Sequence, residues 1–293
     1  MSIQINTLLT RSFDALSGLI IAMKGVSSMM KLCKKGFMVF LLLVAFIGCS
    51  TTTDMATGDK RGIQPLPLRV GVTPDFPPVI FKQAGKLAGV EFDLAHLLSK
   101  ELGRPVEFVE VNWNDQISAL LEGRTDIIMS GMSITEAREV RIDFTSPYMR
   151  RGLMAAMRSE DAPRYNSVER IFLDYLSVGV VKGTTSDVFV QHKMPKARRI
   201  PLLKAEDAVY EFQARRIDLF IHDAPSIVWL VAENEADLKG LWKFLNEEYI
   251  AWGIRKGDDE LLSKANTILE RLKEDGSLQK VLVKWLPYFK ESN

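Results

Sequence analysis

Two segments of the chain repeat one pattern, and this repeat constrains the fold more than any other feature. Residues 120–131 read LLEGRTDIIMSG, and residues 212–223 read FQARRIDLFIHD. Each segment has a helix end, an arginine, one variable residue, an aspartate, a short apolar strand and a polar pair. The polar pairs are Ser130–Gly131 and His222–Asp223. The repeat predicts two related α/β units in which strands alternate with helices.

The position of the polar pairs predicts where a ligand binds. Sheets built from alternating strands and helices are mainly parallel, and they bind ligands beyond the carboxyl ends of their strands. Two units facing each other would therefore bring both pairs to one cleft. We expect one lobe over residues 68–157 and 249–290 and a second over 158–248, with hinge crossings near 152–158 and 248–254.

The stretch that begins SGMSITEAR is suited to hold an anion. Ser133 and Glu136 have the spacing of a capping box, which predicts a helix start with unpaired N–H groups. Ser130 and Ser133 add hydroxyl donors, and Gly131 lets a ligand approach the backbone. Arg138, about one turn into this helix, supplies a planar, permanently charged fork for a carboxylate. An ordinary capped helix with a surface arginine is the alternative.

Several motifs in order resemble the bacterial extracellular solute-binding proteins that feed polar amino acids to ABC importers. They are DIIMSGMSITEAR, DFTSPY, GVEFDLAHLL and KANTILERLKEDGSLQKVLVKWL. The resemblance spans about residues 68–288. It implies a two-lobed α/β fold of the type II periplasmic-binding-protein kind, with a mainly parallel sheet flanked by helices in each lobe. It also implies capture of an amino acid or related small zwitterion by cleft closure, without catalytic residues, cofactor or metal.

The resemblance assigns the ligand's charged groups to particular residues. The arginine that matches Arg138 clamps the α-carboxylate, with Ser133 beside it. A GTT turn in the second lobe, here Thr184 and Thr185, binds the same carboxylate. Asp223 matches the carboxylate that pairs with the α-ammonium. With the aromatic positions Phe76 and Trp113 on either side of the ligand, the predicted ligand-binding set is Phe76, Trp113, Ser130, Gly131, Ser133, Arg138, Thr184, Thr185 and Asp223.

Structural alternatives remain open for some of these residues. Thr184–Thr185 could be a plain helix N-cap, Asp223 could cap a helix that starts near Pro225, and Trp113 could be a core residue. We interpret Asp93, near the start of the helix 92–102, as a structural cap and not as a ligand contact.

The N-terminal region has the features of an export signal. Lysines precede an apolar run over residues 37–47, which is too short to span a bilayer comfortably. The run ends at Gly48–Cys49, which resembles a bacterial lipobox and predicts lipidation of Cys49. A plain secretory signal is the alternative. Residues 1–48 are the predicted signal region, with translation expected to start at Met29 or Met30, and residues 49–67 are the lipidated cysteine and a tether.

Composition excludes several functional classes. The formal net charge of the 293-residue chain is +1 and no dense basic run occurs in the body, so no nucleic-acid partner is expected. Both cysteines, Cys33 and Cys49, precede the body, which excludes disulfides and cysteine nucleophiles there. The chain has no phosphate-binding G-x-x-x-x-G-K-[ST] motif. The resemblance implies a monomer, lipid-anchored in the periplasm or cell envelope, that serves an ABC permease, and the missing motif implies a separate ATPase.

Two other functions are compatible with this pattern. A few proteins that resemble these binding proteins dehydrate cyclohexadienyl acids such as prephenate and arogenate, which requires a positioned acid. Of the predicted cleft residues only Asp223 supplies a carboxylate, so we expect no enzyme activity. The chain could instead sense a ligand for a separate partner protein.

Overall fold

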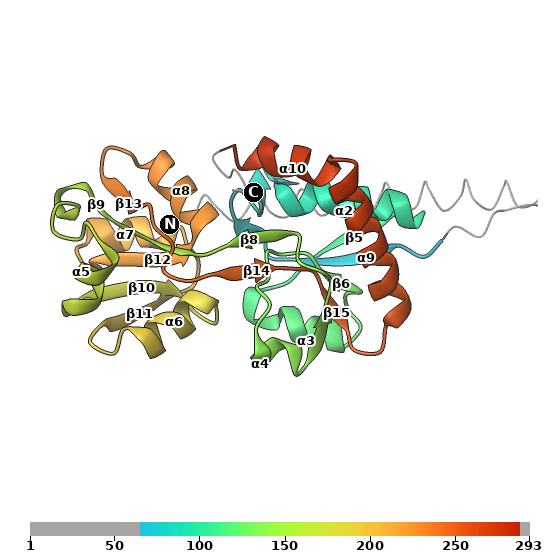
Figure 1. Cartoon of the computed structure of the whole chain (residues 1–293), viewed down its shortest axis with the longest axis horizontal. Helices are drawn as coiled ribbons and strands as arrows, with labels where there is room; N and C mark the ends of the chain where they lie inside the picture. The colour runs from blue at the N-terminus through green and yellow to red at the C-terminus, as the bar shows by residue number, and fades with distance from the viewer. Residues whose placement is uncertain (1–64, 288–293) are drawn as a thin grey trace, which may run out of the picture. The chain divides into compact units, whose positions relative to one another are not determined.

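The computed structural model describes residues 65–287, so the predicted signal region and the expected lipidation at Cys49 lie outside the described residues. The described part has two five-stranded sheets, each flanked by helices (Figure 1). The two-lobed α/β fold expected from the sequence is confirmed. Among the described residues, no helix combines the length and the apolar character needed to cross a membrane.

The first lobe is built on a sheet in the order β5-β1-β6-β15-β7. Its strands are β1 (Leu68–Val72), β5 (Val106–Glu110), β6 (Ile127–Ile128), β7 (Ile142–Phe144) and β15 (Gly253–Arg255). A small sheet beside it contains β2 (Asp75–Phe76), β3 (Ile80–Gln83) and β4 (Lys86–Ala88). The helices are α2 (Val90–Leu102), α3 (Gln116–Leu121), α4 (Glu136–Glu139), α9 (Asp259–Glu274) and α10 (Ser277–Trp285), with the 3-10 turn η1 (Trp113–Asp115).

The second lobe repeats this plan with the order β11-β10-β12-β9-β13. Its strands are β9 (Leu153–Arg158), β10 (Ser177–Val181), β11 (Arg198–Leu202), β12 (Leu219–Asp223) and β13 (Leu238–Leu241). Its helices are α5 (Val168–Leu173), α6 (Thr185–Lys193), α7 (Asp207–Gln213) and α8 (Ala224–Glu233), with the 3-10 turn η2 (Ser159–Asp161). One strand in each sheet is antiparallel to its neighbours, β15 in the first and β9 in the second.

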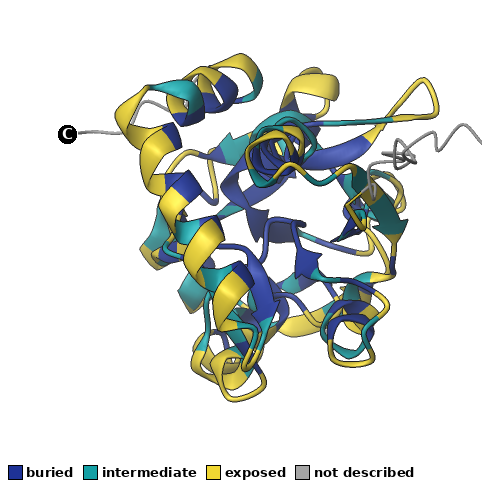
Figure 2. Ribbon diagram, turned by 90° about the vertical axis from the view of Figure 1, so that its right-hand side faces the viewer, coloured by how far each residue is buried: buried dark blue, intermediate teal, exposed yellow. Residues whose placement is uncertain are grey.

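The helices pack against the sheets through apolar side chains that recur along one helical face. In the first lobe, α2, α9 and α10 bury one face against β1, through residues such as Leu94, Leu98 and Leu269. The second lobe has separate cores on the two faces of its sheet. In Figure 2 the strands are buried in the middle, whereas the outer helical faces are exposed. Burial of these side chains contributes roughly 25 cal/mol per Å² of apolar surface.

The repeated aspartate has the same structural role in both lobes. Val70 of β1 lies opposite Ile127, and Val178 of β10 lies opposite Leu219. In this register Asp126 accepts a hydrogen bond from the Arg69 N–H at 2.9 Å, and Asp218 accepts one from the equivalent Ser177 N–H at 2.8 Å. Each aspartate therefore accepts a hydrogen bond at the start of a central strand. The polar pairs four and five residues later then lie at the carboxyl ends of β6 and β12.

The chain crosses between the lobes through a two-stranded ribbon. β8 (Met149–Arg151) pairs antiparallel with β14 (Glu248–Ile250). β9 belongs to the second sheet, whereas residues up to 157 were predicted to lie in the first lobe. The apolar strand β9 lies between β12 and β13, and these partners are distant in sequence, so local pattern did not reveal them.

Candidate ligand-binding cleft

A cavity opens between the two lobes and the ribbon, with about 500 Å³ of empty space including its mouth. Side chains from both lobes and from β8 line it. They are Thr73, Asp75, Phe76, Trp113, Ser130, Ser133, Arg138, Arg151, Val181, Thr184, Thr185, Leu203, Lys204, Ala205, His222 and Asp223. This set includes all of the predicted ligand-binding residues except Gly131.

Ser133 does not cap a helix, contrary to the capping-box prediction. The helix α4 begins at Glu136, and the Thr135 hydroxyl accepts from the Arg138 N–H instead. Ser133 forms an isolated antiparallel bridge with Ile250 of β14, so its backbone is extended. Its hydroxyl is buried and donates to Glu248 at 2.5 Å.

Arg138 projects from α4 into the cleft. Its Nη1 donates to the Ser133 carbonyl at 2.8 Å, and its guanidinium lies 5.3 Å from the centre of the Trp113 ring. Burial lowers the pKa of Arg138 to about 10, with Glu248 and Asp223 acting in the opposite direction. The side chain is therefore cationic at neutral pH and is able to receive a carboxylate.

Asp223 faces Arg138 across the cleft from the end of β12. It makes no capping hydrogen bond to α8, so the alternative that it caps this helix does not hold. Burial raises its pKa to about 7, although the neighbouring Arg151 favours the ionised form. His222 beside it is buried, and this burial lowers the pKa of its imidazole to about 3, so the ring is neutral.

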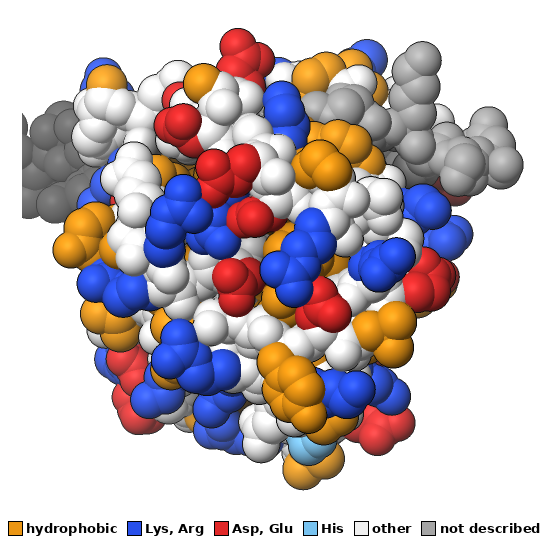
Figure 3. All heavy atoms as spheres, turned by 90° about the vertical axis from the view of Figure 1, so that its left-hand side faces the viewer, with side chains coloured by type: hydrophobic (Ala, Val, Ile, Leu, Met, Phe, Trp, Pro, Cys, Tyr) orange, Lys and Arg blue, Asp and Glu red, His pale blue; other side chains and the backbone are white. Residues whose placement is uncertain are grey.

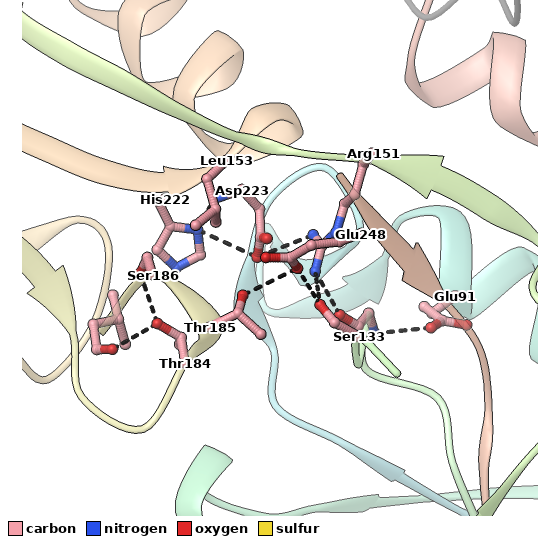
Figure 4. A network of polar contacts seen from close by, with 12 residues as sticks. Glu91, Ser133, Arg151, Leu153, Thr184, Thr185, Ser186, His222, Asp223 and Glu248 are labelled. Carbon is pink, nitrogen blue, oxygen red and sulfur yellow. Dashed lines mark hydrogen bonds and ion pairs between the residues drawn. The ribbon is translucent and has the colours of Figure 1, made fainter. Parts of the chain in front are cut away.

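The two threonines of the second lobe have different roles (Figure 4). Thr184 is the N-cap of α6, accepting from the Asp187 N–H and donating to the Val181 carbonyl at 2.7 Å. The Thr185 hydroxyl donates to Glu248 at 3.0 Å. Since Ser133 donates to the same oxygen of Glu248, this buried carboxylate joins the two lobes.

The two predicted aromatic residues both contact the opposite lobe. Phe76 lies 5.6 Å from the His222 ring and 5.2 Å from the Arg151 guanidinium, measured to ring centres. Trp113 donates its indole N–H to the Gly183 carbonyl at 3.1 Å. Trp113 is only partly buried and lines the cavity, so it is not a fully buried core residue.

Gly131 does not line the cavity but packs against Phe76, which does. Its φ of +66° favours glycine, and a Cβ there would lie 2.7 Å from the Phe76 ring. The buried carboxylate of Glu91 accepts from the Gly131 N–H at 2.8 Å, from Tyr148 and from Trp252. These bonds oppose burial, which raises the pKa of Glu91 to about 7. Ser130 accepts from the Thr73 N–H at 2.9 Å, which fixes the other half of this turn.

Asp93 neither caps α2 nor contacts the cavity. The helix starts after Gly89 without a side-chain cap. The Asp93 carboxylate accepts from Lys284 at 2.6 Å and from the Trp285 indole at 2.7 Å, which ties α10 to α2. The expected structural role is therefore present, but it is a tertiary tether.

Two charged residues at the cleft, Arg151 and Glu248, were not predicted from the sequence, and both are buried. Strand alternation was the available signal. In β8, Met149 and Arg151 point inward while Arg150 is exposed, and in β14 Glu248 and Ile250 point inward. The inward direction of Arg151 and Glu248 depends on the pairing of β8 with β14, which the sequence alone does not specify.

Comparisons with known proteins identify the relatives of this chain. The family model of bacterial extracellular solute-binding proteins, family 3, matches residues 68–288. A putative ABC transporter arginine-binding protein 2 of Escherichia coli (strain K12) is 29% identical over 223 residues, which cover 74% of this chain and 90% of that protein. The histidine-binding periplasmic protein of Salmonella typhimurium is 30% identical over 236 residues, covering 76% and 89%.

The fold also matches solved structures. The crystal structure of the ancestral amino acid-binding protein AncCDT-1, a precursor of cyclohexadienyl dehydratase, superposes with a TM-score of 0.69. It is 36% identical and covers 74% of this chain and 94% of that chain. The resemblance drawn from the motifs is thus confirmed by the family match and by the fold.

Proposed function

The chain belongs to family 3 of the bacterial extracellular solute-binding proteins, and on this premise we propose that it captures an amino acid or related small zwitterion for an ABC importer. One observation carries the proposal. Arg138 of the first lobe and Asp223 of the second line the same cavity, with opposite charges on its two sides. Relatives named as arginine-binding and histidine-binding proteins support a ligand of this class.

In the proposed complex, Arg138 receives the α-carboxylate and Asp223 the α-ammonium. Ser130 and Ser133 lie beside the carboxylate site, and Phe76 and Trp113 contact the ligand side chain. Gly131 leaves room for the Phe76 ring. Thr184 and Thr185 complete the second-lobe wall. Charge-assisted hydrogen bonds contribute about 1.5–3 kcal/mol each, so a few give micromolar affinity, roughly 8 kcal/mol. Because the ligand contacts both lobes, it stabilises the closed arrangement over the open one.

Arg138→Ala tests this function directly. The substitution removes two charge-assisted hydrogen bonds between the guanidinium and the ligand carboxylate, worth about 3–6 kcal/mol. Binding should therefore weaken at least about 100-fold. Calorimetry against the natural amino acids gives the affinity, and thermal melting shows whether the fold survives. Arg141→Ala is the matched control, because Arg141 is exposed three residues further on. Near-normal affinity in Arg138→Ala would refute the assignment.

The proposal includes attachment to the membrane through Cys49 and a role as a monomer in the periplasm or cell envelope. The apolar run over 37–47 followed by Gly48–Cys49 supports lipidation. Metabolic labelling with a radioactive fatty acid tests this step. Label that persists in Cys49→Ser would contradict it.

A dehydratase is the second candidate function. Two observations favour testing it: the similarity to a binding protein described as a precursor of cyclohexadienyl dehydratase, and the buried acid Asp223 with its pKa raised to about 7. Such a pKa suits a proton donor near neutral pH. Turnover of prephenate or arogenate by the purified protein, abolished in Asp223→Asn, would establish this activity in place of transport.

A further inference from the structure

Arg151 is a second arginine at the cleft, and it is buried in the ribbon strand β8. Its side chain is 2% exposed and lines the cavity. One terminal nitrogen, Nη2, donates to the Gly131 carbonyl at 2.9 Å and to the Ser133 hydroxyl at 3.3 Å. The other, Nη1, lies 3.0 Å from Asp223 Oδ2 (Figure 4). Arg151 therefore contacts both Ser133, beside the proposed carboxylate site, and Asp223, the proposed ammonium site.

Part of this ion pair has no hydrogen-bond partner within the described residues. Three buried atoms of the pair make no hydrogen bond to the described residues: Arg151 Nε, Arg151 Nη1 and Asp223 Oδ1. Nη1 lies 3.0 Å from Asp223 Oδ2, but this ion pair lacks hydrogen-bond geometry. Buried polar groups left unpaired are costly, and native structures nearly always satisfy them. A ligand in this cavity that offers an acceptor to Arg151 and a donor to Asp223 would satisfy both.

Among the side chains that line the cavity, positive charges outnumber negative ones. Arg138, Arg151 and Lys204 are positive, whereas Asp75 and Asp223 are negative and His222 is neutral. The buried carboxylate of Asp223 already has the Arg151 cation beside it. A ligand's α-ammonium would therefore share this carboxylate with Arg151. A cationic ligand side chain would find Asp75, which is partly buried and lies near Lys204. The other nearby carboxylate, Glu248, already accepts hydrogen bonds from Ser133, Thr185 and Asn246.

We propose that Arg151 is a ligand-binding residue that selects amino acids with an acidic side chain. In this arrangement Arg138 holds the α-carboxylate, Asp223 Oδ1 accepts from the α-ammonium, and Arg151 donates to the side-chain carboxylate. The inference rests on the proposed function and narrows its ligand class. It separates this chain from the relatives that are named for binding arginine and histidine.

The ligand ranking of the wild-type protein is the first test. Calorimetry compares L-glutamate and L-aspartate with their neutral isosteres L-glutamine and L-asparagine, with L-arginine and L-lysine, and with glutarate. An acidic amino acid is expected to bind about 10- to 100-fold more tightly than its amide, the effect of one charge-assisted bond. Glutarate should bind more weakly than glutamate, because it offers Asp223 no ammonium.

The possible outcomes separate this inference from the proposed function. A preference for arginine, lysine or any neutral amino acid would overturn the role of Arg151 while leaving amino-acid capture intact. A preference for cationic amino acids that disappears in Asp75→Asn would assign the side-chain site to Asp75. Absence of binding to any amino acid would overturn both proposals.

Variants of Arg151 provide the second test. In Arg151→Gln the ratio of glutamate to glutamine affinity should fall about 10- to 100-fold towards unity. Arg150→Gln is the matched control, because the neighbouring Arg150 is exposed and pairs with Glu247 at 3.1 Å outside the cavity. Should Arg151→Gln fail to fold, Arg151→Lys keeps a cation beside Asp223 but loses the fork, and the ratio should still fall. An unchanged ratio in the folded variants refutes the proposal.

Discussion

At Asp223, burial and a neighbouring cation act in opposite directions on one carboxyl group. The side chain is almost fully enclosed and lies 3.0 Å from Arg151. Enclosure removes water from the charged form, and this effect exceeds the attraction of Arg151, so the pKa is raised to about 7. Asp223 therefore changes its protonation state close to neutral pH, where it is expected to accept the ligand's ammonium.

Ligand affinity should consequently fall as the solution becomes acidic. The ammonium needs the ionised carboxylate, and below a pKa of about 7 the ionised fraction drops about tenfold per pH unit. We expect the dissociation constant to rise by about this factor between pH 6.5 and pH 5.5, and to level off above pH 8. Calorimetry across this range checks the prediction.

Two variants identify the group responsible. Asp223→Asn should bind weakly and lose this pH dependence. Asp75→Asn should keep it, although burial raises the pKa of Asp75 to about 6 and this group also lines the cavity. A wild-type affinity that is constant from pH 5.5 to 8 would contradict the assignment of the ammonium to Asp223.

The site residues differed in how far the sequence could predict them. Arg138 and Asp223 lie in motifs whose residue types and order predict ligand binding. The structure brings both residues to one cavity. Arg151 was not predicted because its inward direction depends on strand pairing between β8 and β14. Two adjacent arginines look alike in sequence, and only the pleat sends Arg150 to solvent and Arg151 inward.

At the scale of elements, tertiary pairing overrode a local helix signal. The sequence S-x-x-E favours a cap at Ser133, but the bridge between Ser133 and Ile250 holds that residue extended, and α4 starts three residues later. The buried hydroxyl of Ser133 then reaches Glu248 of β14, which also accepts from Thr185 at the start of α6. This three-residue contact is a clasp between the two lobes and the ribbon.

The clasp should contribute to ligand affinity by favouring the closed arrangement. Thr185→Val removes one hydroxyl donor at nearly constant shape. Glu248→Gln places an amide where Asn246 Nδ2 donates at 2.9 Å. Each change should weaken binding, and the double variant should weaken it by less than the sum, with a coupling energy of about 0.5–3 kcal/mol. Calorimetry on the four proteins of this cycle measures the coupling.

A distant threonine supplies the control for the cycle. The Thr267 hydroxyl donates to the Ser263 carbonyl within α9, and Thr267 is exposed and does not line the cavity, so Thr267→Val should leave affinity unchanged. If the effects of Thr185→Val and Glu248→Gln add without coupling, the two side chains act independently and the clasp has no role in binding.

For the whole molecule, the repeat predicted two lobes, but it did not predict which lobe each crossing strand joins. β9 and β15 pair with strands far away in sequence, and each becomes the antiparallel member of its sheet. The second-lobe face in Figure 3 mixes basic and acidic side chains with scattered hydrophobic ones. The distribution of surface charge therefore provides no further information about the fold. Apolar patterning determines the lobes, whereas long-range pairing determines the hinge.

Contacts between the lobes suggest how ligand binding affects the stability of the whole molecule. Trp113 bonds to Gly183, and Phe81 of β3 packs against Trp229 of α8 with ring centres 5.4 Å apart. A ligand held by Arg138 and Asp223 adds to these contacts, so it should stabilise both lobes together. At 100 times the dissociation constant the stabilisation is about 2.7 kcal/mol, which corresponds to a rise of about 5–10 °C in Tm for a domain of this size.

Differential scanning calorimetry with and without the preferred amino acid measures this shift. If the lobes unfold in separate transitions without ligand, both should move upward together, because the ligand is bound only while the two lobes face each other. Arg138→Ala should reduce the shift to less than about 2 °C at the same ligand concentration. A ligand that raises the melting temperature of one lobe alone would mean that it contacts only that lobe, and that binding does not depend on closure.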